Sequence, residues 1–236
     1  MKKAHLILSF DAPIMSFGGV VVDNFGYTDP FPSASMLAGL IGNALGYDRA
    51  EGERLQVLQD RLVYAARVDR PGLPLMDFQT AAIAKDDKGW TTRGEPEGRA
   101  GGEIRGKHIR YRHYWADRVV RVALRLEPAD GPPDLDEISA ALVAPARPLF
   151  IGRKPCLPSA PILADRVEAS SAVGALELLT PFSTGELVEL FWPDGEDGVS
   201  MPLKAFDHTG RRDWVSGVHG GWERWNRGVL AVGMAP

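Results

Sequence analysis

The chain has 236 residues, of which 44% are hydrophobic and 25% charged, and its formal net charge is −4. This length allows one large domain or two small ones, the composition is ordinary for a globular protein, and no run approaches the roughly 20 apolar residues that a membrane span needs. The single cysteine, Cys156, excludes an internal disulfide, and no Cys and His residues have zinc spacing. We therefore expect a reducing, cytoplasmic setting with no metal or cofactor.

The first elements along the chain are a predicted strand and a predicted helix. Residues 5–10 form a mostly apolar run that Pro13 ends, because proline has no amide for a β-ladder. The helix has Ser33 or Ser35 as its N-cap and Gly46 as a left-handed C-cap. Its apolar face is formed by Met36, Leu37, Leu40, Ile41, Ala44 and Leu45.

The next part of the chain predicts a further strand and a long hairpin. A second amphipathic patch at residues 55–61 precedes an expected strand at residues 62–68. Residues 71–82 hold another strand or a sheet edge, and residues 85–98 are polar, rich in glycine and typical of a loop. Together with the basic segment that follows, they predict a long hairpin projecting from the sheet.

Beyond the hairpin, the sequence predicts a strand, a helix and a last strand. Apolar and charged side chains alternate from Val119, which indicates a half-buried strand. Asp134 with Glu137 resembles a capping box and begins a helix that Pro145 closes. The last strand is expected around residues 148–152. The alternating strand has Val120, Val122, Leu124 and Leu126 on one face, and Arg121 and Arg125 on the other.

This order of elements predicts an α+β fold with a ferredoxin-like βαββαβ core, similar to an RRM, and a hairpin inserted between its middle strands. We divide the chain into a ferredoxin-like domain at residues 1–165, with the basic hairpin at about residues 80–118, and a smaller β-rich extension at residues 166–236. In the extension, residues 187–192 and 229–232 are typical of strands. Three tryptophans are expected in a core or an interface: Trp214, Trp222 and Trp225.

The segment from Arg99 to Arg125 is strongly basic inside an acidic protein. Its eight Arg and Lys residues stand against only Glu103 and Asp117, which gives a formal charge of +6. Such asymmetry points to a polyanion contacted by one arm. Rings interleaved with cations suit single-stranded RNA, although a solvated charged hairpin with no special role explains the same pattern. The interleaved rings are His108, Tyr111, His113, Tyr114 and Trp115.

A second basic feature lies at Gly152, Arg153 and Lys154, in a stretch rich in proline. A rigid turn that presents Arg and Lys beside glycine suits a phosphate contact. A proline-stiffened connector with solvated cations explains these residues equally well.

One reading of the basic segment is catalytic. Metal-independent cleavage of RNA needs a general acid or base that titrates near pH 7 and a cation for the charge that develops on phosphate. His108 and Lys107 provide these groups, with a tyrosine such as Tyr111, Tyr114 or Tyr47. RNA contact without chemistry explains the same residues, so both alternatives stay open.

Four short segments, in this order, resemble motifs of the CasD family of CRISPR-associated proteins. Residues 13–18 are similar to its Pro-x-x-Ser-aromatic-Gly turn, and residues 32–46 to its first helix. Residues 112–117 resemble its Arg-x-Tyr-Leu-x-Asp segment, with Trp115 in place of the usual leucine. Residues 151–156 resemble its Leu-Gly-Arg-(Arg/Lys)-x-Cys turn.

The resemblance implies a RAMP-type RNA-binding core with a hairpin thumb. It implies a cytoplasmic subunit of a type I Cascade complex in antiviral defence, which holds the 5′ handle of CRISPR RNA. The partners implied are the CRISPR RNA, the CasC-type backbone subunit and the CasA-type large subunit, with target DNA contacted indirectly and no membrane. The motifs are most similar to the type I-E branch, which is non-catalytic. The type I-C branch cuts repeat RNA with a Tyr, Lys and His set, so Lys107 and His108 leave that alternative open.

The hypothesis from the sequence is thus a non-catalytic RNA-binding subunit. Endoribonuclease activity through Lys107, His108 and Tyr111 is the alternative. The candidate RNA-binding residues are Ser16, Phe17, Gly18, Arg105, Lys107, His108, Arg110, Tyr111, Arg112, Tyr114, Arg153 and Lys154.

Overall fold

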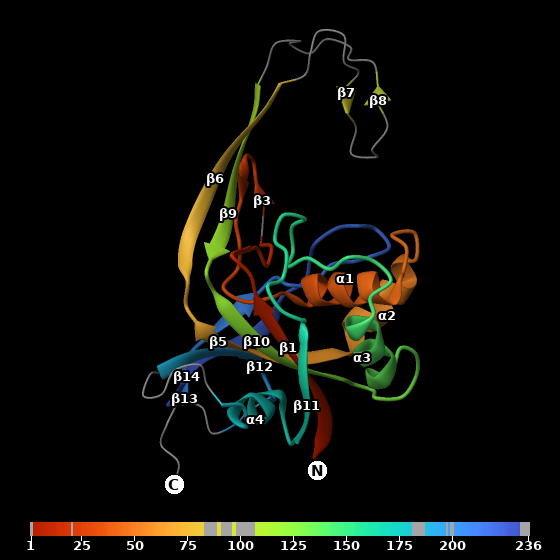
Figure 1. Ribbon diagram of the computed structural model, residues 1–236, viewed down its shortest axis with the longest axis vertical. Coiled ribbons are helices and arrows are strands. Elements are labelled where there is room, and N and C mark those ends of the chain that lie inside the picture. Colours follow the sequence, from red (N-terminus) through yellow and green to blue (C-terminus); the bar gives the residue numbers. More distant parts are fainter. Residues whose placement is uncertain are drawn as a thin grey trace.

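The largest element of the fold is a seven-stranded sheet in which every neighbouring pair is antiparallel. The strand order is β11-β1-β10-β5-β12-β14-β13 (Figure 1). Its strands are β1 (Lys3–Asp11), β5 (Leu62–Arg70), β10 (Val119–Leu126), β11 (Leu163–Ala169), β12 (Leu187–Pro193), β13 (Met201–His208) and β14 (Glu223–Ala231). The computed structural model describes residues 2–19, 21–82, 89–90, 96–97, 107–180, 187–196, 198 and 201–231.

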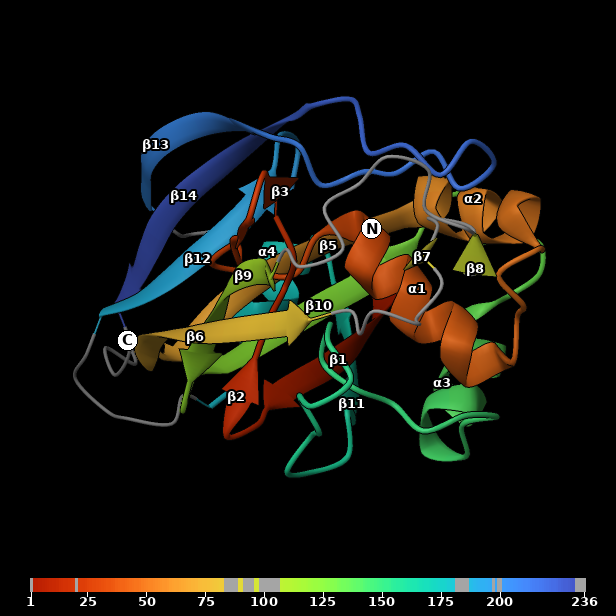
Figure 2. The same cartoon turned by 90° about the horizontal axis from the view of Figure 1, so that it is seen from above.

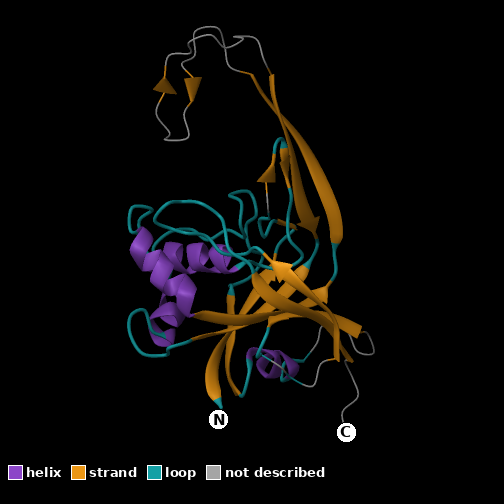
Figure 3. Cartoon of the chain, turned by 180° about the vertical axis from the view of Figure 1, so that it is seen from behind, coloured by secondary structure: helices purple, strands orange, loops and turns teal. Residues whose placement is uncertain are grey.

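Helices cover both faces of this sheet (Figure 3). On one face, α1 (Ala34–Leu45) and α3 (Leu135–Val143) pack with Leu6 and Leu8 of β1, and α2 (Gly52–Arg61) lies beside α1. On the other face, α4 (Ala172–Glu177) packs on Ile7 of β1 and Ala65 of β5. Because β1 is buried on both sides, its sequence is a continuous apolar run. Among the described residues, no helix is both long and apolar enough to pass through a membrane.

The capping predictions for α1 and α3 are confirmed. The Ser33 hydroxyl accepts a hydrogen bond from the Met36 amide at 3.2 Å, and Gly46 ends α1 with a φ of 81°. At α3, the Glu137 amide donates to the Asp134 carboxylate at 2.8 Å, and the Asp134 amide donates to the Glu137 carboxylate at 2.9 Å. These reciprocal bonds satisfy amides that have no partner inside the helix.

A long hairpin of β6 (Leu73–Ala82) and β9 (Lys107–Ala116) extends away from the body of the protein (Figure 1). Figure 2 views the molecule from the side toward which this hairpin extends. The edge of β9 opposite β6 pairs with β2 and, in parallel, with β4. The predicted Arg105 lies outside the described residues. Lys107 and His108 begin β9, and their side chains are also outside the described part. The remaining short strands are β2 (Ile14–Met15), β3 (Val21–Val22), β4 (Phe25–Gly26), β7 (Gly89–Trp90) and β8 (Pro96–Glu97).

The last strand of the predicted βαββαβ unit was misplaced. Residues 148–152 do not form a strand, and β11 takes that place at the sheet edge beside β1. The amide of Ile151 instead donates to the carbonyl oxygen of Cys156 at 2.7 Å, which closes a turn. Prolines around this segment cannot donate to a ladder. The true strand was overlooked because most of its side chains are exposed, so it carries little apolar alternation.

The C-terminal strands β12, β14 and β13 continue the same sheet through the pairing of β12 with β5. The boundary drawn between residues 165 and 166 falls inside β11, and the division into domains remains a prediction. Of the three tryptophans, Trp225 is buried in the core, Trp214 packs partly against it, and Trp222 is 70% exposed.

Candidate nucleic-acid interface

Strand β9 carries the cations and rings that alternate in the sequence. Successive side chains of a strand point to opposite faces. Arg110 and Arg112 therefore lie on one face of the hairpin, and Tyr111 and His113 lie on the other. The rings of Tyr111 and His113 thus lie on the face opposite the two arginines, whereas Tyr114 shares the face of the arginines.

The face of β9 that carries Tyr111 and His113 is called the ring face. It holds a row of aromatic side chains from β9 and the neighbouring segments. The Tyr111 ring centroid lies 4.8 Å from that of Phe25 and 5.4 Å from that of Phe78. The Tyr27 ring lies 6.0 Å from Phe25 and 5.0 Å from His113. Phe78 and Tyr27, which the sequence analysis did not single out, are 54% and 45% exposed. Phe78 and Tyr27 are the most exposed side chains of this row, and the Tyr111 ring lies between those of Phe25 and Phe78.

The face of β9 that carries Arg110 and Arg112 is called the cation face. Its side chains are exposed at the outer part of the hairpin and buried near the body of the protein. Arg110 is exposed and donates to the side-chain oxygen of Asn24 at 2.5 Å. Arg112 is half-buried, and the structure shows no ion pair for it among the residues it describes. Tyr114, on the same face, is 3% exposed, and the guanidinium of Arg153 lies over its ring at 4.7 Å. The Tyr114 ring is thus covered by Arg153, and its stacking on a base stays a prediction.

Three arginines of the basic segment are used inside the protein. Arg125 forms two hydrogen bonds of 2.7 Å with the buried carboxylate of Glu196, and Arg121 pairs with Asp69 at 3.1 Å. Arg118 is 3% exposed, and this burial lowers its pKa to about 10. Strand β10 is thus covered on both faces, although alternation predicted a half-buried strand. Fewer cations of the segment from Arg99 to Arg125 are therefore available to bind a polyanion than its formal charge of +6 suggested.

Two turns that are far apart in the sequence lock together beside β9. The Ser16 amide donates to the Ile151 carbonyl at 3.3 Å. Gly152 has a φ of +83°, and a Cβ atom built on it would lie 1.7 Å from the carbonyl oxygen of Ser16. Arg153 fixes the second turn by donating to the carbonyl oxygens of His113 and Gly26, each at 3.0 Å. The turn is therefore part of the wall that supports β9.

The exposed and buried residues of this second turn differ in what they offer a ligand. Lys154 is exposed. Arg153 already donates to two carbonyl groups, so only part of its hydrogen-bonding capacity remains. Cys156 is fully buried, and burial raises the pKa of its thiol.

A cavity of about 880 Å³ lies between these turns and the start of α1. Four predicted residues line it: Ser16, Phe17, Gly18 and Arg153. Its third wall comes from the loop at residues 209–222, which the sequence analysis could not interpret. That loop contributes Thr209, Arg212, Trp214 and His219. Burial, followed by the nearby Arg212 charge, lowers the pKa of His219. Within the described residues, no group of His, Cys, Asp and Glu side chains is arranged to hold a metal ion.

Three of the four motif segments line this cavity, and the fourth, residues 112–117, contacts the first. Besides the contact between Ser16 and Ile151, the Asp117 amide donates to the Pro13 carbonyl at 3.1 Å. The Asn43 side chain of α1 donates to the Pro148 carbonyl at 3.0 Å. Segments separated by more than a hundred residues thus form one surface.

The model of the family described as CRISPR-associated protein (Cas_Cas5) matches residues 5–222 of this chain. The chain belongs to this CRISPR-associated Cas5 family. The CRISPR system Cascade subunit CasD of Escherichia coli (strain K12) is 28% identical over 174 residues, which cover 74% of this chain and 76% of that relative. The resemblance to the CasD family, which the sequence suggested, is confirmed.

Solved structures agree with the Cas5 assignment at the level of the fold. A chain of a CRISPR RNA-guided surveillance complex superposes with a TM-score of 0.67 at 24% identity, covering 97% of this chain and 90% of that one. A crystal structure of a Cas protein gives a TM-score of 0.64 at 23% identity, covering 98% and 99%. The hairpin and the seven-stranded sheet thus belong to a fold shared with these proteins.

Proposed function

We propose that this Cas5-family chain is a non-catalytic CRISPR RNA-binding subunit of a type I-E Cascade complex. It holds the 5′ handle and contacts the CasC-type and CasA-type subunits. The observation that carries the proposal is that three of the four CasD-like segments line one cavity beside the hairpin, while the fourth, in the hairpin strand β9, contacts the first. The Escherichia coli relative, named as a Cascade subunit, supports the assembly.

The proposal includes a ferredoxin-like core. Strands β1, β5, β10 and β11 are the first to fourth strands of the predicted unit, with α1 after the first and α3 after the third. Their order in the sheet is fourth, first, third, second, and all their pairings are antiparallel. This arrangement supports the ferredoxin-like assignment, with the hairpin inserted between the second and third strands.

The cation face can be tested by removing both of its outer charges. We expect Arg110→Gln with Arg112→Gln to weaken binding of single-stranded repeat RNA and to flatten its salt dependence. Each phosphate contact on a single strand contributes about 0.7 to the slope of log affinity against log salt, so the slope should fall by about 1.4. Filter-binding titrations at several salt concentrations measure both quantities.

The matched control removes two exposed charges elsewhere. Arg54 and Arg166 both have solvent-exposed side chains and lie on α2 and β11. Their joint replacement by glutamine changes the net charge equally and should leave the salt slope unchanged. Equal slopes for the parent protein and the Arg110 and Arg112 double variant would contradict the proposed RNA contact.

The non-catalytic part of the proposal has a separate test. We expect no cleavage when the protein is incubated with repeat RNA in EDTA and the products are separated on a denaturing gel. Cleavage that disappears in His108→Ala would instead establish the alternative, a metal-independent endoribonuclease that uses Lys107 and His108. The backbone places both residues at the start of β9.

A further inference from the structure

Three neighbouring strands of the seven-stranded sheet continue into the sheet that contains the hairpin. Strand β1 leads into β2, β5 leads into β6, and β9 leads into β10. The strands are neighbours on both sides, in the order β1-β10-β5 and in the order β2-β9-β6. Each passes between the sheets through two residues that belong to neither strand, and we call these three breaks the crossing. The crossing consists of residues 12–13, 71–72 and 117–118.

The backbone at the crossing changes the direction of the strands. Gly72 and Asp117 have left-handed φ angles of 63° and 53°, whereas a strand needs an extended backbone. The breaks also contact one another. The Asp117 amide donates to the Pro13 carbonyl at 3.1 Å, and a Cβ atom built on Gly72 would lie 2.5 Å from the Ala116 carbonyl oxygen. The packing of the crossing therefore sets the direction in which the hairpin extends.

The guanidinium of Arg118 is buried in the crossing and contacts both the hairpin and the body of the protein. It donates to the carbonyl oxygen of Pro71, where β6 is about to begin, at 2.7 Å. It also lies over the ring of Trp115 in β9, at 4.1 Å from the centroid. On the side of the body, it donates to the carbonyl oxygen of Pro30 at 2.8 Å and lies 4.0 Å from the carboxylate of Glu189 in β12.

Stability alone does not explain a guanidinium at this place. Replacing a buried ion pair by apolar side chains of similar volume is often neutral or even stabilising, and the Arg118 carboxylate partner is as far away as 4.0 Å. An apolar side chain could not donate to two carbonyl oxygens at once. The planar fork of arginine holds two acceptors and a ring in one fixed arrangement.

The other arginines near the crossing have different positions. Arg70 donates to the Asp117 carbonyl at 2.9 Å, but its side chain is 43% exposed, so water competes for this contact. Arg153 donates to Gly26 and His113, which both belong to the sheet that contains the hairpin. Of these three arginines, Arg118 is the buried one that joins this sheet to the body.

We propose that Arg118 is a positioning residue, which fixes the direction of the hairpin and so places Arg110 and Arg112 for the RNA. Because Arg118 is buried, it acts through the fold and does not contact the RNA. The inference rests on the proposed function for its effect on RNA. A hairpin that sampled several directions would be competent to bind for only a fraction of the time, and the apparent affinity would fall by that fraction.

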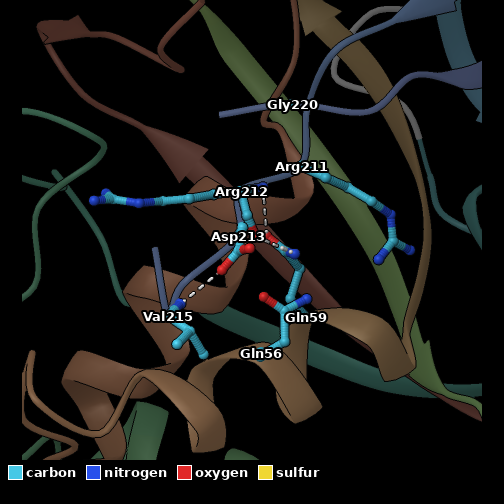
Figure 4. A pocket seen from close by; sticks show the side chains of 7 residues that line it. All are labelled: Gln56, Gln59, Arg211, Arg212, Asp213, Val215 and Gly220. Carbon is cyan, nitrogen blue, oxygen red and sulfur yellow. Dashed lines mark hydrogen bonds between the residues drawn. The ribbon is translucent and has the colours of Figure 1, made fainter. Parts of the chain in front are cut away.

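Helix α2 provides a fixed reference point on the body. Gln59 donates to the Arg212 carbonyl at 2.9 Å and accepts from the Arg212 amide at 3.2 Å (Figure 4). Gln56 accepts from the Trp214 amide at 3.0 Å. The helix is thus held to the loop at residues 209–222. A spin label at Val57, which is 52% exposed, therefore reports the position of the body.

Double electron–electron resonance between labels at Val57→Cys and Thr80→Cys measures the direction of the hairpin in the full-length protein. Thr80 is exposed in β6, and Cys156 is fully buried, so it should not take a label. We expect a narrow distance distribution without further substitution and a broader one with Arg118→Gln. Binding of fluorescein-labelled single-stranded repeat RNA should weaken about tenfold, if about a tenth of the molecules hold the binding direction.

Two further variants complete the test. Arg118→Lys keeps the charge but not the planar fork, so its distribution and affinity should lie between the other two, and it serves where Arg118→Gln does not fold. Arg61→Met is the matched control, because Arg61 is also buried and donates to carbonyl oxygens, but it lies at the other end of β5. It should lower the melting temperature without changing the distances or the RNA affinity.

The outcomes separate this inference from the proposed function. Unchanged distances in both Arg118 variants, or equal broadening in Arg61→Met, would refute the positioning role and leave the proposed function standing. Broader distances with unchanged RNA affinity would refute it as well. If the protein without these substitutions binds no RNA, the proposed function falls, and the distances still decide whether Arg118 fixes the hairpin.

Discussion

Gly152→Ala is expected to destabilise the protein by about 2–5 kcal/mol and to abolish tight RNA binding. The left-handed backbone at φ +83° costs an alanine about 1–2 kcal/mol. The added methyl group would lie 1.7 Å from the Ser16 carbonyl oxygen, and such overpacking costs a further 1–3 kcal/mol or so. Because a backbone oxygen cannot rotate away as a side chain can, the two turns must separate.

A glycine with the same backbone but open surroundings serves as the control. Gly195 has a φ of +86°, and a Cβ atom built on it meets nothing within 4 Å. Gly195→Ala should therefore cost only the backbone term of about 1–2 kcal/mol. Urea unfolding measures both variants, and RNA titration should show a loss for Gly152→Ala alone. Equal destabilisation by the two substitutions would show that the Ser16 and Gly152 turns are not in tight contact.

Much of the fold follows from short-range chemistry. Residues 34–45 and 135–143 form helices as predicted, because each has a capping side chain at its start and an apolar face that fits the 3.6-residue period. The strands at residues 5–10, 62–68 and 119–126 were also predicted, because central strands buried on both faces carry long apolar runs. These signals depend only on near neighbours in the chain.

The parts that could not be predicted depend on contacts between distant residues. Strand β11 lies at a sheet edge with most of its side chains exposed, so its sequence has no clear apolar alternation to distinguish it from a loop. Arg125 could be recognised as buried only by knowing that Glu196 lies opposite. Arg212 was missed for a related reason, because only the fold brings its loop beside the motif turns. The sequence therefore predicted the part of the candidate site that the motif turns form, but not the part that the loop at residues 209–222 forms.

Arg61→Met is expected to lower the free energy of unfolding by about 2–4 kcal/mol, although the sequence suggested only the end of an amphipathic patch. Arg61 is 6% exposed, and its guanidinium donates to five carbonyl oxygens in the loop between β10 and α3, at 3.0–3.2 Å. A hydrogen bond to a charged donor contributes about 1.5–3 kcal/mol to stability. Water can replace some of the lost bonds at the surface of the loop, so the expected loss is smaller than the sum of five such bonds. These acceptors belong to Pro128, Ala129, Gly131, Pro132 and Pro133.

Two comparisons distinguish this bonding from simple loss of charge. Arg61→Lys keeps the charge, but its single nitrogen has three donors and cannot reach five acceptors, so it should recover only part of the stability. Arg166→Met removes an arginine whose side chain is 48% exposed and whose partner is Asp136, which should cost about 0–1 kcal/mol. Urea unfolding midpoints measure all three. Full stability in Arg61→Met would mean that the loop is held by its own backbone, since the guanidinium would then be dispensable.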